Sequence, residues 1–181
     1  AQLDTVHYLP PVCQCAGLPD QGGIYISTPS LVPVPFTITD GAGNVLASGS
    51  VSNTDYYRFQ MTGSNADAFV LAGDCGVVQT DRGFIVRSEE PVYANLRYGM
   101  ILDNQAISIT SKGRKAFGQS FRLAHVRSNP YNRSYASFTI MGTQPNTMVS
   151  IDQSGINLTL PGANAPAAKQ QIVINLPIWM P

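Results

Sequence analysis

The stretch "GFIVRSEEPVYANLRY", residues 83–98, alternates apolar and polar side chains on both sides of an acidic interruption. Such alternation is typical of β-strands that bury one face. The stretch therefore predicts one strand within residues 82–88 and a second within residues 91–98. Glu89 and Glu90 lie between them, directly before Pro91, and we expect a solvated turn there. Because neighbouring residues of an extended chain point to opposite faces, these two carboxylates are poorly placed to act as an acid and base pair.

The same two-residue period recurs along the chain, with turn residues between the runs. Further runs lie at residues 22–29, 34–52, 55–61, 120–126, 136–142, 148–154, 156–160 and 170–176. "DGAGN" at 40–44 and "TDRG" at 80–83 have the composition of hairpin turns. No window predicts a helix of normal length, and "APAAKQQ" at 165–171 would form at most one or two turns. The sequence thus predicts an all-β fold of antiparallel β-sandwich modules.

An internal echo indicates two such modules in tandem. "IYISTPSLVPVPFTITDGAGNV", from residue 24, and "FTIMGTQPNTMVSIDQSGINL", from residue 138, share one scheme of strands and turns, in which Ile26 matches Ile140 and Ile38 matches Ile151. We expect an N-terminal extended segment at 1–23, a first β-sandwich module at 24–109, a bridging segment at 110–134 and the front part of a second module at 135–181. The second copy has no equivalent of residues 83–98, so we expect that module to be incomplete.

Composition and charge narrow the class of protein. Of 181 residues, 44% are hydrophobic and 12% are charged, so the chain can bury a core. The formal net charge is zero, although ten of the eleven acidic residues lie within residues 1–103 and six of the eleven basic residues lie within residues 104–151. A net charge of zero argues against a dedicated nucleic-acid binder, for which a strongly basic face is expected. The start "AQLDTV" fits a mature end left by a signal peptidase, although a trimmed chain would begin in the same way, and we expect export.

The cysteine count is odd. If one disulfide forms among Cys13, Cys15 and Cys75, one thiol stays free. Cys13 and Cys15 are too close to bridge each other easily, whereas either could reach Cys75. Export therefore favours a disulfide from Cys75 to Cys15 or Cys13. Zinc would need further ligands, and only His7 is nearby, so we expect no metal and no other cofactor.

The sequence offers little for catalysis. Only His7 and His125 could serve as an imidazole base, and neither accompanies a nucleophile motif, so we expect a protein that is not an enzyme. Exposed aromatic residues suggest a second hypothesis, a carbohydrate-binding, lectin-like β-sandwich module with Tyr56 and Tyr57 as glycan contacts.

Five motifs in fixed order carry a family resemblance. They are "HYLPP" at 7–11, "IYISTP" at 24–29, "GFIVRSEEPVYANLRY" at 83–98, "TSKGRKAFGQSFRLAH" at 110–125 and "SFTIMGTQPNTMVSI" at 137–151. In that order the chain resembles the N-terminal region of gliding-motility-associated cell-surface adhesins exported by the type IX secretion system, and the module called the IgGFc-binding-protein N-terminal domain. The resemblance implies a noncatalytic assembly and adhesion module at the outer membrane. It also implies as partners the secretion and gliding machinery and an outer-membrane β-barrel protein resembling the PorP family. The cysteines are not part of the family pattern.

The basic stretch at 110–125 is expected to bridge the two modules. Two glycines predict a bend, the basic side chains are expected to extend outward, and burial of the two Phe rings is expected to hold the segment in place. The residues assigned to this bridge are Lys112, Arg114, Lys115, Phe117 and Phe121.

An incomplete second module would leave an open sheet edge that a partner could cover by strand addition. "LPIWMP" at 176–181 would lie at that junction, with Trp179 as a buried anchor. The residues assigned to the partner interface are Ile178, Trp179, Met180, His7 and Tyr8. Thr5 lies in "DTV", which resembles the O-glycosylation signal of these bacteria.

Overall fold

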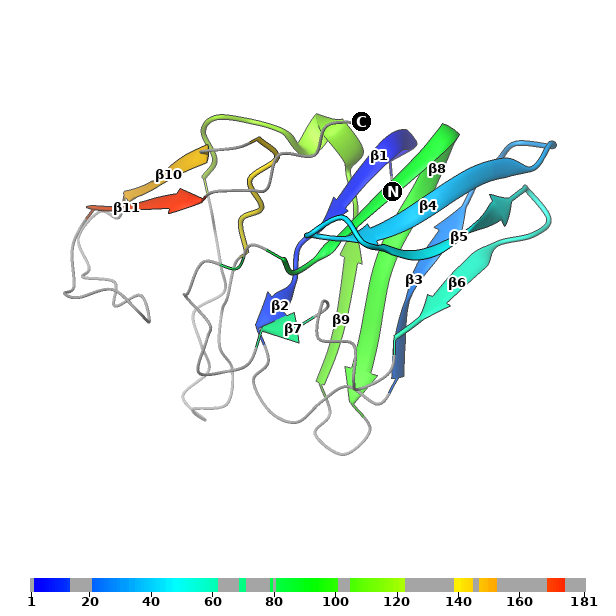
Figure 1. Cartoon of the computed structure of the whole chain (residues 1–181), viewed down its shortest axis with the longest axis horizontal. Coiled ribbons are helices and arrows are strands. Elements are labelled where there is room, and N and C mark those ends of the chain that lie inside the picture. The colour runs from blue at the N-terminus through cyan, green and yellow to red at the C-terminus, as the bar shows by residue number, and fades with distance from the viewer. Residues whose placement is uncertain are drawn as a thin grey trace.

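The computed structural model describes residues 2–13, 21–61, 69–70, 79, 81–100, 105–122, 139–144, 147–152 and 169–174. In this part of the chain the regular structure consists of β-strands and one short 3-10 element, η3 (Gly113–Ala116). Seven of the strands form one antiparallel network (Figure 1). The prediction of an all-β fold is confirmed.

One long strand, β8 (Phe84–Met100), is shared by two sheets. Its first part pairs with β1 (Asp4–Leu9) and with β4 (Val34–Asp40), which in turn pairs with β5 (Val45–Val51). Its second part pairs with β9 (Gln105–Thr110) and with β3 (Gln21–Ser27), which in turn pairs with β6 (Tyr57–Gln60). We call β5-β4-β8-β1 the first sheet and β6-β3-β8-β9 the second sheet. Together they form a near-barrel.

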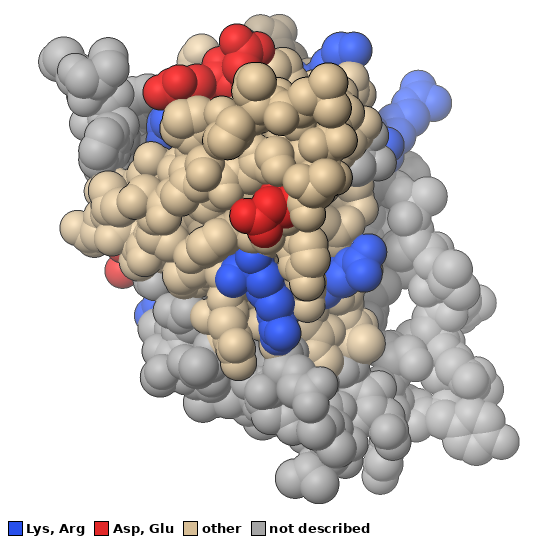
Figure 2. All heavy atoms as spheres, turned by 90° about the vertical axis from the view of Figure 1, so that its right-hand side faces the viewer, with Lys and Arg blue, Asp and Glu red and all other residues tan. Residues whose placement is uncertain are grey.

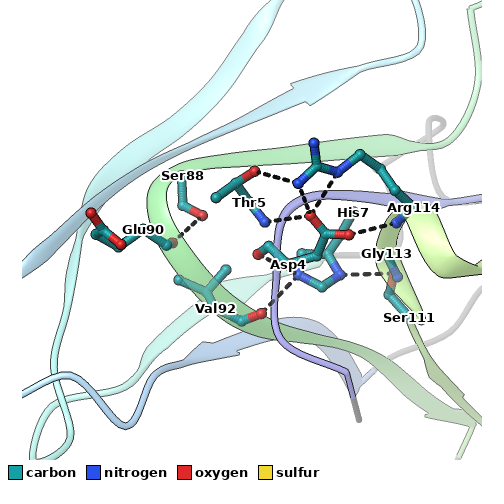
Figure 3. A network of polar contacts seen from close by, with 9 residues as sticks. All are labelled: Asp4, Thr5, His7, Ser88, Glu90, Val92, Ser111, Gly113 and Arg114. Carbon is teal, nitrogen blue, oxygen red and sulfur yellow. Dashed lines mark hydrogen bonds and ion pairs between the residues drawn. The ribbon is translucent and has the colours of Figure 1, made fainter.

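The acidic interruption of the sequence is a bend within β8, and not a turn between two strands. Cα pairing with β4 ends at Ser88, and pairing with β3 begins at Tyr93. Between them, Glu89 and Glu90 are exposed, and the Ser88 hydroxyl donates a hydrogen bond to the carbonyl oxygen of Glu90 at 2.7 Å. The ribbon of β8 bends sharply there (Figure 3). The solvated position was predicted, but the chain stays extended through it and passes from one sheet to the other.

The core lies between the two sheets, and the two-residue period explains its composition. Along β4, Val34, Phe36 and Ile38 are all buried, while the residues between them are partly or fully exposed. Aromatic rings meet across the core: Phe59 of β6 lies 6.0 Å from Phe84 of β8 between ring centroids. Complete burial of a side chain such as Phe84 stabilises the fold by roughly 1.5–3 kcal/mol.

The hairpin predicted at residues 40–44 connects β4 to β5. The Asp40 carboxylate accepts the backbone N–H of Asn44 at 2.7 Å and its side-chain amide at 2.8 Å. Gly43 has a φ of +92°, a backbone conformation that favours glycine. Local side-chain chemistry therefore closes this turn.

The second predicted module is only partly described. β10 (Thr147–Asp152) pairs with β11 (Lys169–Ile174), so Ile151 lies in a strand as predicted. However, the strand predicted at 136–142 is absent from its described residues 139–142, and Ile140, the predicted match of buried Ile26, is 38% exposed. The tandem arrangement stays a prediction.

Elsewhere β2 (Val12–Cys13) pairs in parallel with β7 (Phe69–Val70).

Candidate functional site

Polar side chains gather where the two sheets diverge, beside the bend of β8. β1 is the edge of the first sheet and β9 is the edge of the second, and the segment after β9 folds back onto β1 (Figure 3). Four side chains meet there, and we call them the clasp: Asp4, His7, Ser111 and Arg114.

His7 is the centre of the clasp and is fully buried. Its Nε2 lies 2.8 Å from the carbonyl oxygen of Val92 and 3.1 Å from that of Asp4. Carbonyl oxygens only accept hydrogen bonds, so Nε2 carries a hydrogen, and in the neutral ring Nδ1 is an acceptor. Nδ1 lies 2.9 Å from the hydroxyl of Ser111, which donates to it and accepts the backbone N–H of Gly113 at 3.1 Å. Every side-chain polar atom of this pair therefore has a partner.

The His7–Ser111 pair has the residue types of a nucleophile and its base, but its geometry serves structure. Both residues are buried, Ser111 being 6% exposed. A base must receive the nucleophile's proton and pass it on to the leaving group, whereas Nε2 of His7 is held by two backbone carbonyls. The pair links β1 to Val92 of β8 and to the segment that follows β9.

The Asp4 carboxylate binds the segment after β9 through Arg114. Its Oδ2 accepts the backbone N–H of Arg114 at 2.7 Å, and its Oδ1 accepts the guanidinium Nε–H at 2.9 Å. Oδ1 also accepts the backbone N–H of Thr5 at 2.7 Å. The side-chain hydrogen bond from Arg114 is the main cause that lowers the pKa of Asp4 well below its ordinary range, while burial of the carboxyl group opposes that shift.

Gly113 lets the two segments approach this closely. Its φ of +59° is left-handed, and a Cβ built there would collide with the side chain of Asp4. A glycine in the predicted bend is thus required by contact with β1 as well as by backbone conformation.

The structure changes the account of the predicted bridge. Burial of Phe117 and Phe121 was expected to hold the segment, but they are 46% and 62% exposed. Phe117 does contact Tyr8 edge to face, at 5.4 Å between ring centroids. Arg114 was expected to extend outward and instead closes the clasp, whereas Lys112 and Lys115 are exposed as predicted. Hydrogen bonds to a buried carboxylate therefore hold this segment more than Phe burial does.

Residues assigned to recognition have different surroundings. His7 was assigned to a partner interface, but its side chain is fully buried within this chain. Tyr56 is 66% exposed, whereas Tyr57 packs against Phe36 at 4.8 Å between ring centroids. Thr5 is partly buried, and its hydroxyl accepts a hydrogen bond from Arg114 at 3.3 Å.

Several predicted residues lie outside the described part of the chain. These are Cys15, Cys75, His125, Ile178, Trp179 and Met180. Only the backbone of Cys13 is described, in β2, where it is the partner of Val70. The disulfide and the C-terminal interface stay predictions.

A second polar arrangement lies on the outer face of the second sheet. Tyr25 of β3 has Arg58 of β6 on one side and Arg97 of β8 on the other, with the guanidinium carbons 5.6 and 5.8 Å from the ring centroid. The side chain of Asn95 accepts a hydrogen bond from Arg97 at 3.3 Å and donates one to Thr110 at 2.7 Å.

Sequence reasoning missed Asp4, Ser111 and the group around Tyr25. No local signal could reveal the clasp, because Asp4 and Arg114 are 110 residues apart and each has ordinary neighbours. The period-two pattern could have placed Tyr25 and Arg97 on solvent-facing positions, but it could not show that their side chains are in contact.

Within the described residues no helix has the length and apolar character needed to cross a membrane. In the same residues no three His, Cys, Asp or Glu side chains form a group suited to a metal ion. Comparisons with protein-family models, with curated proteins and with solved structures find no match to this chain. The resemblance to surface adhesins therefore stays a prediction from sequence motifs.

Proposed function

We propose that this protein is a noncatalytic assembly and adhesion module of a large exported cell-surface protein of the gliding-adhesin type. In this proposal it is held at the outer membrane by a protein resembling the PorP family. The observation that carries it is an exposed apolar end of the near-barrel, formed by turns that are hydrogen-bonded to each other. Leu31 and Val32 of the β3–β4 loop are 84% and 65% exposed, and Tyr56 of the β5–β6 turn is 66% exposed. We call these three residues the loop end.

Hydrogen bonds hold the loop end in shape. The backbone N–H of Asn53 donates to the carbonyl oxygen of Ser30 at 2.8 Å, which ties the two turns together. The Ser30 hydroxyl donates to the carbonyl oxygen of Val32 at 2.9 Å, and Thr28 donates to the carbonyl oxygen of Pro91 at 3.0 Å. Figure 2 views the side on which these turns lie, and uncharged side chains cover most of its described surface. Large exposed apolar side chains on an ordered loop favour a protein partner.

The test is capture of an outer-membrane protein in mild detergent, with the captured protein identified by mass spectrometry. A matched control is available, because Val45, the first residue of β5 at the other end of β4, is 63% exposed. We expect the unmodified chain and the Val45→Ser variant to capture the same PorP-like protein, and the Leu31→Ser/Val32→Ser variant to lose it. Equal capture by both variants would contradict the proposed surface, and capture of no such protein would contradict the anchoring role.

A carbohydrate-binding module is the second candidate, because Tyr25 lies on an exposed sheet face between two arginines. Glycan binding that persists in the Leu31→Ser/Val32→Ser variant would place it on a separate surface.

A further inference from the structure

The outer face of the second sheet carries positive charge without any acidic residue in its strands. This sheet consists of β3, β6, β9 and residues 92–100 of β8. Their charged residues are Arg58 of β6 and Arg97 of β8, and they contain no Asp or Glu. Tyr25 is the register partner of Arg58, and Gly23 is the register partner of Arg97. Two cations from strands on either side of β3 therefore converge on one tyrosine ring.

Within the described part of the chain, the side-chain hydrogen bonds of these two arginines are long and go to neutral groups. Arg58 donates to the carbonyl oxygen of Gly22 at 3.4 Å, and Arg97 donates to Asn95 at 3.3 Å. The described ion pairs involve other residues. A cation over an aromatic ring is held in place while the edges of its planar guanidinium stay available for a forked contact with an anion.

Neutral hydrogen-bonding groups continue the face beside Arg97. Asn95 donates to the hydroxyl of Thr110 at 2.7 Å and accepts from Ser108 at 3.5 Å. Amide and hydroxyl groups of this kind pair well with sugar hydroxyls. None of the large exposed hydrophobic residues in the described chain lies on β3, β6, β9 or this part of β8, so the face lacks the apolar anchors of a protein interface.

We propose that this face binds an extended anionic polysaccharide whose sugars carry carboxylate or sulfate groups. Arg58 and Arg97 bind the anionic groups, and Asn95 contacts the sugar hydroxyls beside Arg97. Exposed ion pairs are individually weak, so the ligand is a polymer whose repeated charges engage both arginines at once. The inference rests on the proposed noncatalytic binding role, but it uses a surface other than the loop end.

The test is affinity electrophoresis of the full chain in gels that contain polygalacturonate, dextran sulfate or neutral dextran. The first two polymers distinguish carboxylate from sulfate recognition. We expect retardation by at least one anionic polymer and none by neutral dextran. The Arg58→Gln/Arg97→Gln variant should bind about 10- to 100-fold more weakly, because two charge-assisted contacts are lost. The Arg58→Lys/Arg97→Lys variant keeps the charge, loses the fork and should bind with intermediate affinity.

The matched control is Arg87→Gln, which removes an exposed arginine of the same strand on the first sheet. This variant should bind as the unmodified protein does. The inference is overturned if neither anionic polymer retards the chain, if Arg87→Gln weakens binding as much as the double variant, or if single-stranded DNA or polyglutamate binds equally tightly. Because all three arginines are exposed, thermal unfolding should change little in every variant. The Arg58→Gln/Arg97→Gln variant is also tested for capture of the outer-membrane protein. Because that capture depends on the loop end, its result shows whether the proposed function fails or only this inference fails.

Discussion

Replacing Asp4 by Ala tests whether the clasp holds the two sheets together. The substitution removes an acceptor that is 8% exposed and that binds two backbone N–H groups, of Thr5 and Arg114, at 2.7 Å each. Hydrogen bonds to an ionised group contribute about 1.5–3 kcal/mol each. The guanidinium of Arg114 adds less, because that side chain is 60% exposed and water replaces its contacts. We expect the free energy of unfolding to fall by about 2–3 kcal/mol, since the freed backbone groups regain some water.

The assay is urea and thermal unfolding at pH 7, followed by far-ultraviolet circular dichroism. For a chain of this size the expected loss lowers the Tm by roughly 4–12 °C. Asp55→Ala is the control, because Asp55 is exposed and its side chain makes no described hydrogen bond. Arg114→Ala should destabilise less than Asp4→Ala, because it keeps its backbone N–H bond to Asp4. If Asp4→Ala lies within about 0.5 kcal/mol of the unmodified protein, as expected for a surface substitution, the clasp does not stabilise the fold.

Four further predictions concern the same framework. Gly113→Ala should destabilise at least as much as Asp4→Ala in the same unfolding assay, because its Cβ collides with Asp4 and its φ is left-handed; unchanged stability would contradict the close approach. Ser111→Ala should cost about 1–3 kcal/mol by leaving His7 and the Gly113 N–H without their partner, whereas an increase in stability would show that the bond is absent. Phe84→Ala should cost about 3–5 kcal/mol, since Phe84 is fully buried beside Phe59, and a loss below that of Asp4→Ala would place Phe84 outside the core. Folding lowers the pKa of Asp4, so its contribution is complete well above the unfolded pKa of about 3.9 and is lost as the pH falls below it. Urea midpoints from pH 7 to pH 2 should therefore show the gap between the unmodified protein and Asp4→Asn narrowing in acid, and a constant gap would contradict the assignment.

The sequence by itself determined the fold class and several local features. The two-residue period is a property of an extended chain with one face in the core, so β4 and both parts of β8 could be read from residues a few positions apart. The hairpin at Asp40–Asn44 follows from side-chain chemistry within five residues. The exposed position of Glu89 and Glu90 follows from their charge.

Tertiary structure alone decided which strands pair and where the functional groups meet. The period shows which face of a strand is buried, but it does not name the neighbouring strand, so it could not show that one strand runs through Glu89, Glu90 and Pro91 to serve two sheets. The hydrogen-bond partner of His7 in the interior is Ser111, 104 residues away, and the contacts of Arg58 and Arg97 with Tyr25 depend on the register of three strands. Such contacts form only when distant segments are brought together by burial of the core, a driving force that has no direction and leaves no local pattern in the sequence.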